Sequence, residues 1–332
     1  MQIQHFVRTS LVVLLFAFAL TFSVVYVVPL ITHAQEGLPA GSSVSLTLDP
    51  LFPEPGSAVT VALDAYSIDT SGATITWYVD GAEVPSFRNA RSIILTVGAI
   101  GDTTNVSAVV KSPSLPEFTV RKTIAPSAVD LIVEASTYVP AFYKGRALPS
   151  GESPAHIVAI PHIAGVTDPS SLTYRWEYSG SVLLGGPIRG KQSVDVIVSK
   201  YTGGYVIVTV MNGKGESVAR KSIRLEAMEP ELHFYEENPL RGLSERAIVN
   251  SFILVGDETL IHGEPYFMNT KLTDGGTNFE WTINGNPAQN QADPHTITLQ
   301  RTGGAGHASI GLRAITTTRI PQYVQGNFTI SF

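Results

Sequence analysis

Histidines and carboxylates are the residues with which this sequence could catalyse a reaction or bind a metal. Beyond residue 34 the histidines are His156, His162, His233, His262, His295 and His307. A zinc site needs three or four converging ligands, and no pair here has the i, i+4 spacing of a helix or the His-x-His spacing of a strand. We therefore expect isolated histidines in strands and loops, with no metal site and no bound cofactor.

Motifs for catalysis are also missing. The sequence has no Gly-x-Ser-x-Gly turn, no His-Glu-x-x-His helix and no phosphate-binding glycine loop. Glu236 and Glu237 are neighbours in sequence, but adjacency does not establish the opposed carboxylates, about 5–10 Å apart, of a glycosidase. The sequence therefore predicts that the protein is not an enzyme.

Calcium is the metal that the composition accommodates best, because it needs only oxygen ligands from loops. Aspartates expected in loops are Asp80, Asp102, Asp168 and Asp274. None belongs to a dense run of alternating aspartates, and Asp in such places commonly stabilises a turn. Cysteine is absent, which excludes disulfides and thiolate ligands. We expect a protein without cofactors, and a bound calcium ion is the one alternative that stays open.

The elements that would position any site are indicated by the three tryptophans. They lie in segments that alternate in polarity and end in Gly four residues later, namely Ala73–Gly81, Leu172–Gly180 and Thr277–Gly285. The Trp-to-Trp intervals are 99 and 105 residues, close to the ~100 residues of an immunoglobulin-type sandwich. We expect Trp77, Trp176 and Trp281 in the structural core, each between two facing sheets.

Composition agrees with an all-β protein. Hydrophobic residues make up 44% and charged residues 15% of the 332 residues, with 29 glycines and 21 prolines, a balance typical of folded, turn-rich chains. The net charge is −6. Binding to nucleic acid or docking on anionic lipid would need a basic surface, so we expect neither.

The N-terminal segment predicts export. Residues 11–28 are uncharged and follow Arg8, and Thr32 and Ala34 provide small residues before a cleavage point. The apolar run is also long enough, at ~18 residues, to span a bilayer as a hydrophobic helix. Residues 1–34 are thus a signal peptide or a membrane anchor. In both cases residues 35–332 lie outside the cytoplasm, in the cell envelope or secreted.

The remainder divides into three sandwiches. The predicted parts are a linker at 35–43, sandwich 1 at 44–125, sandwich 2 at 129–226, and sandwich 3 at 230–332 with an insertion at 236–257. A structureless loop of ~20 residues is improbable in a compact domain. We therefore expect the insertion to fold over the third sandwich or to add a strand around 247–254.

Two segments could contact a partner. The loop 140–154 carries Phe142, Tyr143 and Arg146, and Tyr235 and Arg241 flank or belong to the insertion. The loop aromatics could cover an open end of their sandwich or pack on a neighbouring domain. Alternatively, they could face a glycan or peptide, because sandwiches place their contacts on end loops.

The repeated Trp-x-x-x-Gly segments, with the turn Pro53-Glu54-Pro55-Gly56, resemble those of the bacterial immunoglobulin-like and PKD-like domains that occur in tandem on exported surface proteins. The resemblance implies a non-enzymatic surface or envelope protein that acts in adhesion or as a structural arm. Two alternatives stay open. One is an exported protein that binds a glycan or peptide, and the other is an assembly factor that offers an edge strand to a protein partner.

Overall fold

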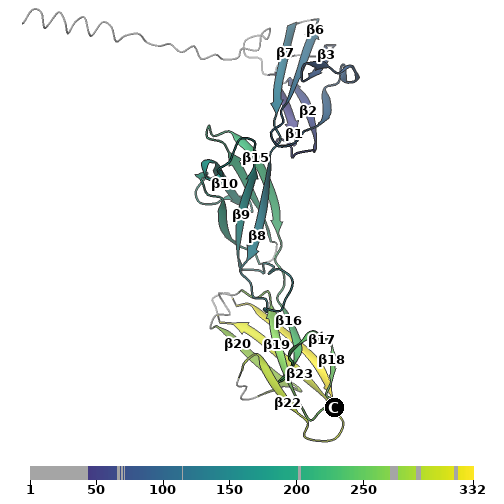
Figure 1. Ribbon diagram of the computed structural model, residues 1–332, viewed down its shortest axis with the longest axis vertical. Coiled ribbons are helices and arrows are strands. Elements are labelled where there is room, and N and C mark those ends of the chain that lie inside the picture. The colour runs from purple at the N-terminus through teal and green to yellow at the C-terminus, as the bar shows by residue number, and fades with distance from the viewer. Residues whose placement is uncertain are drawn as a thin grey trace, which may run out of the picture.

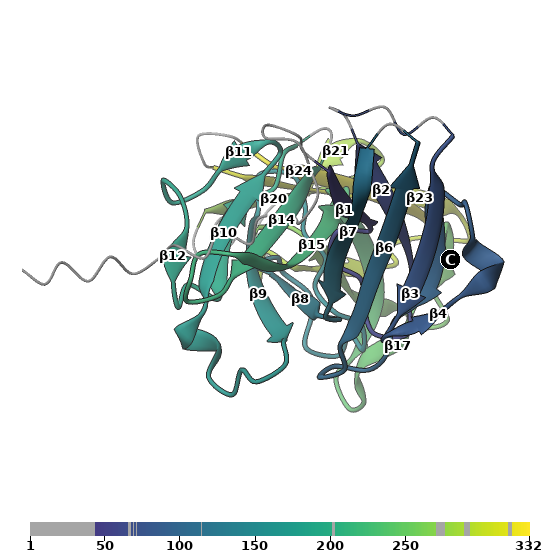
Figure 2. The ribbon, with the colours of Figure 1, turned by 90° about the horizontal axis from the view of Figure 1, so that it is seen from above.

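The computed structural model describes residues 44–332 except 66, 67, 69, 71, 114, 201, 202, 270–275, 289–292 and 318–320. The predicted signal peptide or membrane anchor at 1–34 and the predicted linker at 35–43 lie outside the described residues. Within the described part of the chain, no helix is long and apolar enough to cross a membrane. The chain forms three immunoglobulin-like sandwiches that follow one another along the longest axis (Figure 1) and overlap in projection from above (Figure 2). The prediction of an all-β tandem fold is confirmed.

The first sandwich packs a three-stranded sheet on a four-stranded one. The former has the order β1-β2-β5, with β1 (Val44–Asp49), β2 (Ala58–Ala65) and β5 (Ser92–Thr96). The latter has the order β4-β3-β6-β7, with β3 (Thr74–Val79), β4 (Ala82–Glu83), β6 (Thr104–Ser112) and β7 (Leu115–Ile124). A short 3-10 helix, η1 (Pro85–Phe87), connects β4 to β5.

The second sandwich repeats this plan. One sheet has the order β13-β9-β8, with β8 (Ala128–Ala135), β9 (Pro154–His162) and β13 (Ser193–Ile197). The other has the order β11-β10-β14-β15, with β12 also paired to β10, and consists of β10 (Thr173–Tyr178), β11 (Ser181–Val182), β12 (Ile188–Arg189), β14 (Gly204–Met211) and β15 (Ser217–Leu225). The 3-10 helix η2 (Pro169–Ser171) precedes β10.

The third sandwich is larger. One sheet has the order β17-β16-β19-β22, with β16 (Glu231–Asn238), β17 (Gly242–Ile248), β19 (Glu258–Tyr266) and β22 (Thr296–Gln300). The other has the order β18-β24-β23-β20-β21, with β18 (Ser251–Ile253), β20 (Thr277–Ile283), β21 (Asn286–Pro287), β23 (His307–Thr316) and β24 (Tyr323–Ser331).

The insertion at 236–257 is built into both sheets. Its first residues extend β16, which then forms a hairpin with β17. The chain crosses to the other sheet, where β18 pairs in parallel with β24. β18 lies within the segment 247–254 where we expected an added strand. The insertion thus lengthens each sheet by one strand, which satisfies most of its backbone groups by pairing.

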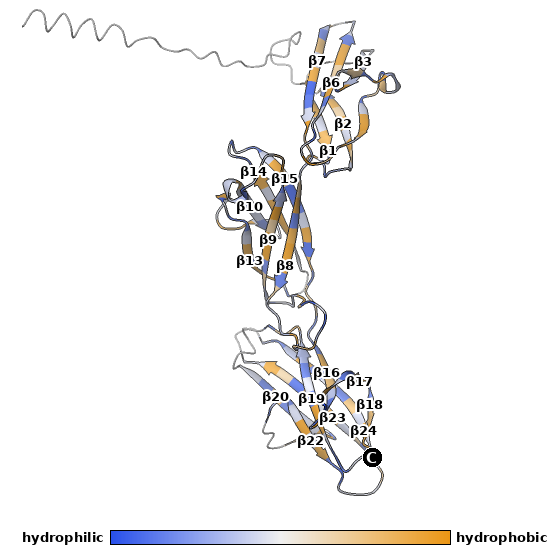
Figure 3. Ribbon diagram, in the orientation of Figure 1, coloured by the Kyte–Doolittle hydropathy of each residue, from blue (hydrophilic) through white to orange (hydrophobic). Residues whose placement is uncertain are grey.

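Alternation of apolar and polar residues along the strands produces the three cores (Figure 3). Trp77, Trp176 and Trp281 are buried, with exposed fractions of 0%, 1% and 3%. Each indole N–H donates a hydrogen bond, at 2.8, 2.8 and 3.0 Å, to a main-chain carbonyl later in its own sandwich: Ala90, Lys191 and Pro294. The indole therefore both fills the core and ties its strand to the segment that leads to the facing sheet.

The hairpin after each tryptophan repeats as well. The residue before each glycine has a positive φ, 49° at Asp80, 47° at Ser179 and 50° at Asn284. The glycines that follow have φ near 80°. Two successive left-handed residues define the tight turn that suits a twisted hairpin. This explains why a small polar residue lies three residues after each Trp and a glycine four residues after it.

Replacing one tryptophan should unfold one sandwich. We expect Trp176→Ala to lower the free energy of unfolding of the second sandwich by about 3–5 kcal/mol, because a large buried ring is lost and a cavity is left. Hydrogen exchange measured by mass spectrometry resolves the three sandwiches separately. Tyr205→Ala, at a strand position that is 55% exposed, is the control. If the second sandwich were equally protected from hydrogen exchange in Trp176→Ala and in the native chain, Trp176 would not be the core residue that stabilises it.

Candidate functional site

The most elaborate arrangement of polar and aromatic side chains lies where the second sandwich meets the third. The loop between β8 and β9, residues 136–153, leaves its own sandwich and contacts the end of β19. The Tyr138 N–H donates to the Met268 carbonyl at 2.6 Å, and the Phe267 N–H donates to the Tyr138 carbonyl at 2.7 Å. Thr137 and Asn269 form an isolated antiparallel bridge. The junction therefore contains a short piece of shared β-ladder.

Aromatic rings cover this ladder. Tyr143 meets the rings of Tyr266 and Phe267 edge-on, with centroids 5.4 and 6.1 Å apart. Phe142 meets Tyr235 in the same way at 5.3 Å. The hydroxyls of Tyr235 and Tyr266 are hydrogen-bonded to each other at 2.8 Å. The rings of Tyr143, Tyr235, Tyr266 and Phe267 belong to one small apolar core, in which edge-to-face pairs contribute beyond the area they bury.

These contacts correct one expectation from the sequence. Tyr235 is only 6% exposed, so it packs inside the junction and cannot reach an external partner. Tyr143 packs on the third sandwich, and Phe142 contacts Tyr235 there while staying 42% exposed. Contact of Phe142 or Tyr143 with an external partner stays a prediction. Arg146, on the same loop, and Arg241, in the turn between β16 and β17, are exposed. Their contact with a partner stays a prediction.

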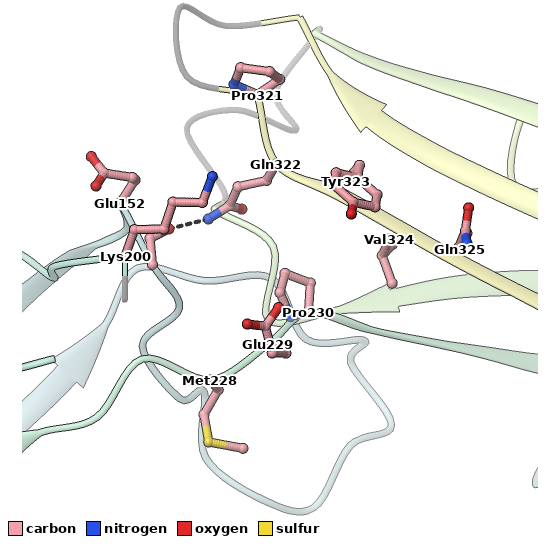
Figure 4. Close-up of a pocket in the computed structure, with 11 residues that line it drawn as sticks. Glu152, Lys200, Met228, Glu229, Pro230, Pro321, Gln322, Tyr323, Val324 and Gln325 are labelled. Carbon is pink, nitrogen blue, oxygen red and sulfur yellow. Dashed lines mark hydrogen bonds between the residues drawn. The ribbon is translucent and has the colours of Figure 1, made fainter. Parts of the chain in front are cut away.

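A polar bridge that involves Gln322 also crosses the junction (Figure 4). The Gln322 side-chain amide donates to Ser150 Oγ at 3.1 Å and to the Gly151 carbonyl, and its oxygen accepts from the Asn269 N–H at 2.9 Å. The Asn269 amide in turn donates to the Glu152 carbonyl at 3.1 Å. Gln322 also borders a cleft of about 460 Å³ between the sandwiches. Two amide side chains thus connect the second sandwich to the third.

An ionisable group lies beside the aromatic cluster. His262 Nε2 is 3.0 Å from Glu264 Oε1, and His262 Nδ1 is 3.5 Å from Glu237 Oε2. The Tyr138 hydroxyl donates to Glu264 Oε2 at 2.8 Å. The hydrogen bond to Glu264 raises the pKa of His262, and the charges of both carboxylates add to it against the effect of burial. Burial, followed by the Glu264 charge, raises the pKa of Tyr138.

A second histidine joins this group. The rings of His262 and His295 are stacked with centroids 5.8 Å apart. His262, Glu264 and His295 each offer a ligand atom, and these atoms lie within 4.8 Å of one another. Within the described ranges, His295 Nδ1 is a buried atom that lacks a hydrogen-bond partner. These three residues could hold a metal ion.

The expectation of isolated histidines is therefore wrong for this pair. β19 pairs with β22, and the Gly263 N–H donates to the His295 carbonyl at 2.8 Å. This pairing brings His295 beside His262 across 33 residues of sequence. The signal in the sequence is His262-x-Glu264, because residues two apart on a strand share a face. A pattern that requires two closely spaced histidines does not include this glutamate.

The loop aspartates that we considered for calcium take part in turns. Asp80 Oδ1 accepts from the Asn105 N–H at 2.8 Å, and Asp102 Oδ2 accepts from the Ala99 N–H at 2.7 Å. Asp168 caps η2, and the hydrogen bonds from Ser170 lower its pKa. Asp274 lies outside the described residues. Calcium binding stays an alternative to the prediction of no cofactor.

No protein-family model matches the sequence, and comparison with curated proteins gives no match. Solved structures with similar tandem arrangements include the three N-terminal domains of the highly immunogenic outer capsid protein of bacteriophage RB49, at 12% identity and a TM-score of 0.23, covering 87% of this chain and 98% of that one. The central fibronectin-III array of RIM-binding protein matches at 12% identity and a TM-score of 0.30, covering 89% and 98%. Such low similarity carries no functional conclusion, and the fold assignment depends on the sheets themselves.

Removing the Tyr138 hydroxyl should loosen the junction. In Tyr138→Phe, the Glu264 carboxylate, only 6% exposed, loses a donor, which typically costs about 1–3 kcal/mol. We expect faster hydrogen exchange in residues 137–148 and 262–269, with the first sandwich unchanged. Tyr205→Phe is the matched control, because it removes an exposed hydroxyl. Unchanged exchange in both junction segments would show that the bond does not stabilise the contact.

Proposed function

We propose that this chain is a non-enzymatic, exported surface or envelope protein that acts as a structural arm, in adhesion or in holding other parts of the envelope at a distance. The observation that carries the proposal is the second junction. There the two sandwiches are joined by the chain itself and also through the loop 136–153. The loop contributes to a piece of β-ladder, an aromatic cluster and two amide bridges. Such an interface supports a fixed angle between neighbouring sandwiches.

The first junction is built more simply. Residues 125–127 connect β7 to β8. Ser127 Oγ donates to the Val218 carbonyl at 2.5 Å, and Lys221 forms an ion pair with Glu54 at 2.7 Å. An exposed ion pair contributes about 0–1 kcal/mol. The second and third sandwiches would therefore form a stiff pair, and the first sandwich could change its angle to them.

The alternative of a glycan- or peptide-binding protein loses support at one of its two loops. Tyr143 of the loop 140–154 packs on the third sandwich, and Phe142 contacts it with one edge while staying 42% exposed. The insertion at 236–257 keeps its role as a candidate contact for an assembly partner, because β17 and β18 are edge strands of their sheets. Edge strands present unpaired backbone groups to which a partner strand can add.

The shape of the arm can be measured in solution by small-angle X-ray scattering. A compact globule of about 290 residues has a radius of gyration near 19 Å. We expect the exported chain to exceed this value clearly, because its sandwiches lie in a row. Substituting Gln322→Ala together with Tyr143→Ala should broaden the distance distribution, whereas Tyr205→Ala should not. A radius close to that of a globule would contradict the proposed arm.

Export can be tested separately with an epitope at the C-terminus of the full chain. In a bacterial host, we expect the epitope to be found outside the cytoplasmic membrane. External protease should remove it once the outer barriers of the cell are permeabilised. An epitope that stays protected until the cytoplasmic membrane is lysed would overturn the exported location.

A further inference from the structure

We propose that His262, Glu264 and His295 form a binding site for one divalent transition-metal ion of the zinc class. The proposal goes beyond the structural arm and does not depend on it. Two imidazole nitrogens and one carboxylate oxygen form a donor set typical of zinc, with a fourth position left for water or another ligand. The three ligand atoms come from β19 and from the residue that precedes β22.

The distances are compatible with a metal after small side-chain movements. Zinc bonds of about 2.1 Å place two ligand atoms of a tetrahedral site about 3.4 Å apart. His262 Nε2 and Glu264 Oε1 are already 3.0 Å apart. All three ligand atoms lie within 4.8 Å of one another. His295 is half-buried, so shifts of about 1 Å shared among the three side chains would close the set without moving the paired backbone.

The surrounding groups are arranged as in a metal site. Glu237 lies on the Nδ1 side of His262, at 3.5 Å, while Nε2 faces Glu264. A carboxylate on the far nitrogen fixes the tautomer of a metal-binding histidine and raises its basicity. The Tyr138 hydroxyl holds Glu264 Oε2 at 2.8 Å, which leaves Oε1 for the ion. Two of the three ligands thus have partners that orient them.

The third ligand supplies an independent observation. Among the described residues, His295 Nδ1 is buried and has no hydrogen-bond partner. The ring packs against Phe279, with centroids 4.3 Å apart, which restricts its rotation. A buried polar atom without a partner costs free energy, and a bound ion or an ion-linked water would remove that cost.

The donor set distinguishes between metals. Calcium and magnesium prefer six or more oxygen ligands, whereas imidazole suits zinc, copper and nickel. A bound ion would connect β19 to the segment before β22 and, through Glu264 and Tyr138, to the second sandwich. We therefore expect it to stabilise the junction and to raise the melting temperature.

The test uses the exported chain, purified without a histidine tag, stripped with a chelator and titrated with zinc by calorimetry. We expect one ion per chain. Glu264→Gln and His295→Ala should each weaken binding at least tenfold, and calcium or magnesium should give no saturable heat. His156→Ala is the control, because His156 is exposed and paired with Asp195. One equivalent of zinc should also slow exchange in residues 262–269 of the native chain.

Two outcomes would overturn the proposal. One is the absence of saturable zinc binding by the native chain, which would leave the group as an ion pair. The other is native affinity in Glu264→Gln and His295→Ala alike. Melting temperatures of the metal-free variants show whether they fold. If His295→Ala does not fold, Glu237→Gln replaces it, since it leaves the three ligands in place and should weaken binding about 10–100-fold; native affinity in that variant would count against the site.

Discussion

The burial of one indole per sandwich is the constraint on which the fold depends. The chain contains no cysteine, so each sandwich is held together by its core and its hydrogen bonds. Trp77, Trp176 and Trp281 each fill the space between the sheets and donate to a carbonyl 13 or 15 residues later. A tight turn follows each tryptophan strand. The strand, the indole hydrogen bond and the turn together form a local unit that is present once in each sandwich.

Contacts between sandwiches differ because their loops differ. The connection from β8 to β9 in the second sandwich is long enough to reach the third, where its backbone pairs and its aromatic rings pack. The first junction has a three-residue connection and an exposed ion pair. The proposed difference in stiffness between the two junctions therefore comes from loop length and loop composition, while the sandwiches themselves keep one plan.

Much of the fold could be predicted from the sequence, because alternation and turn residues are local signals. The tryptophan strands and the Asp80-Gly81 turn follow from such patterns. The added strand at 251–253 is one of two outcomes expected for an insertion too long to be a structureless loop. The junction could not be predicted in this way. Tyr143 and Tyr266 are 123 residues apart, and no local pattern shows which sandwich a loop will contact. His262 and His295 meet for a similar reason, since strand pairing across a sandwich is not visible in residue spacing.

The most direct test of this account is the angle between neighbouring sandwiches, which spin labels can report because native cysteines are absent. Exposed strand isoleucines serve as sites: Ile94 in the first sandwich, Ile197 in the second and Ile253 in the third. Double electron–electron resonance on Ile197→Cys/Ile253→Cys should give one narrow distance distribution, and on Ile94→Cys/Ile197→Cys a broader one. Equally broad distributions for both pairs would contradict the stiff second junction.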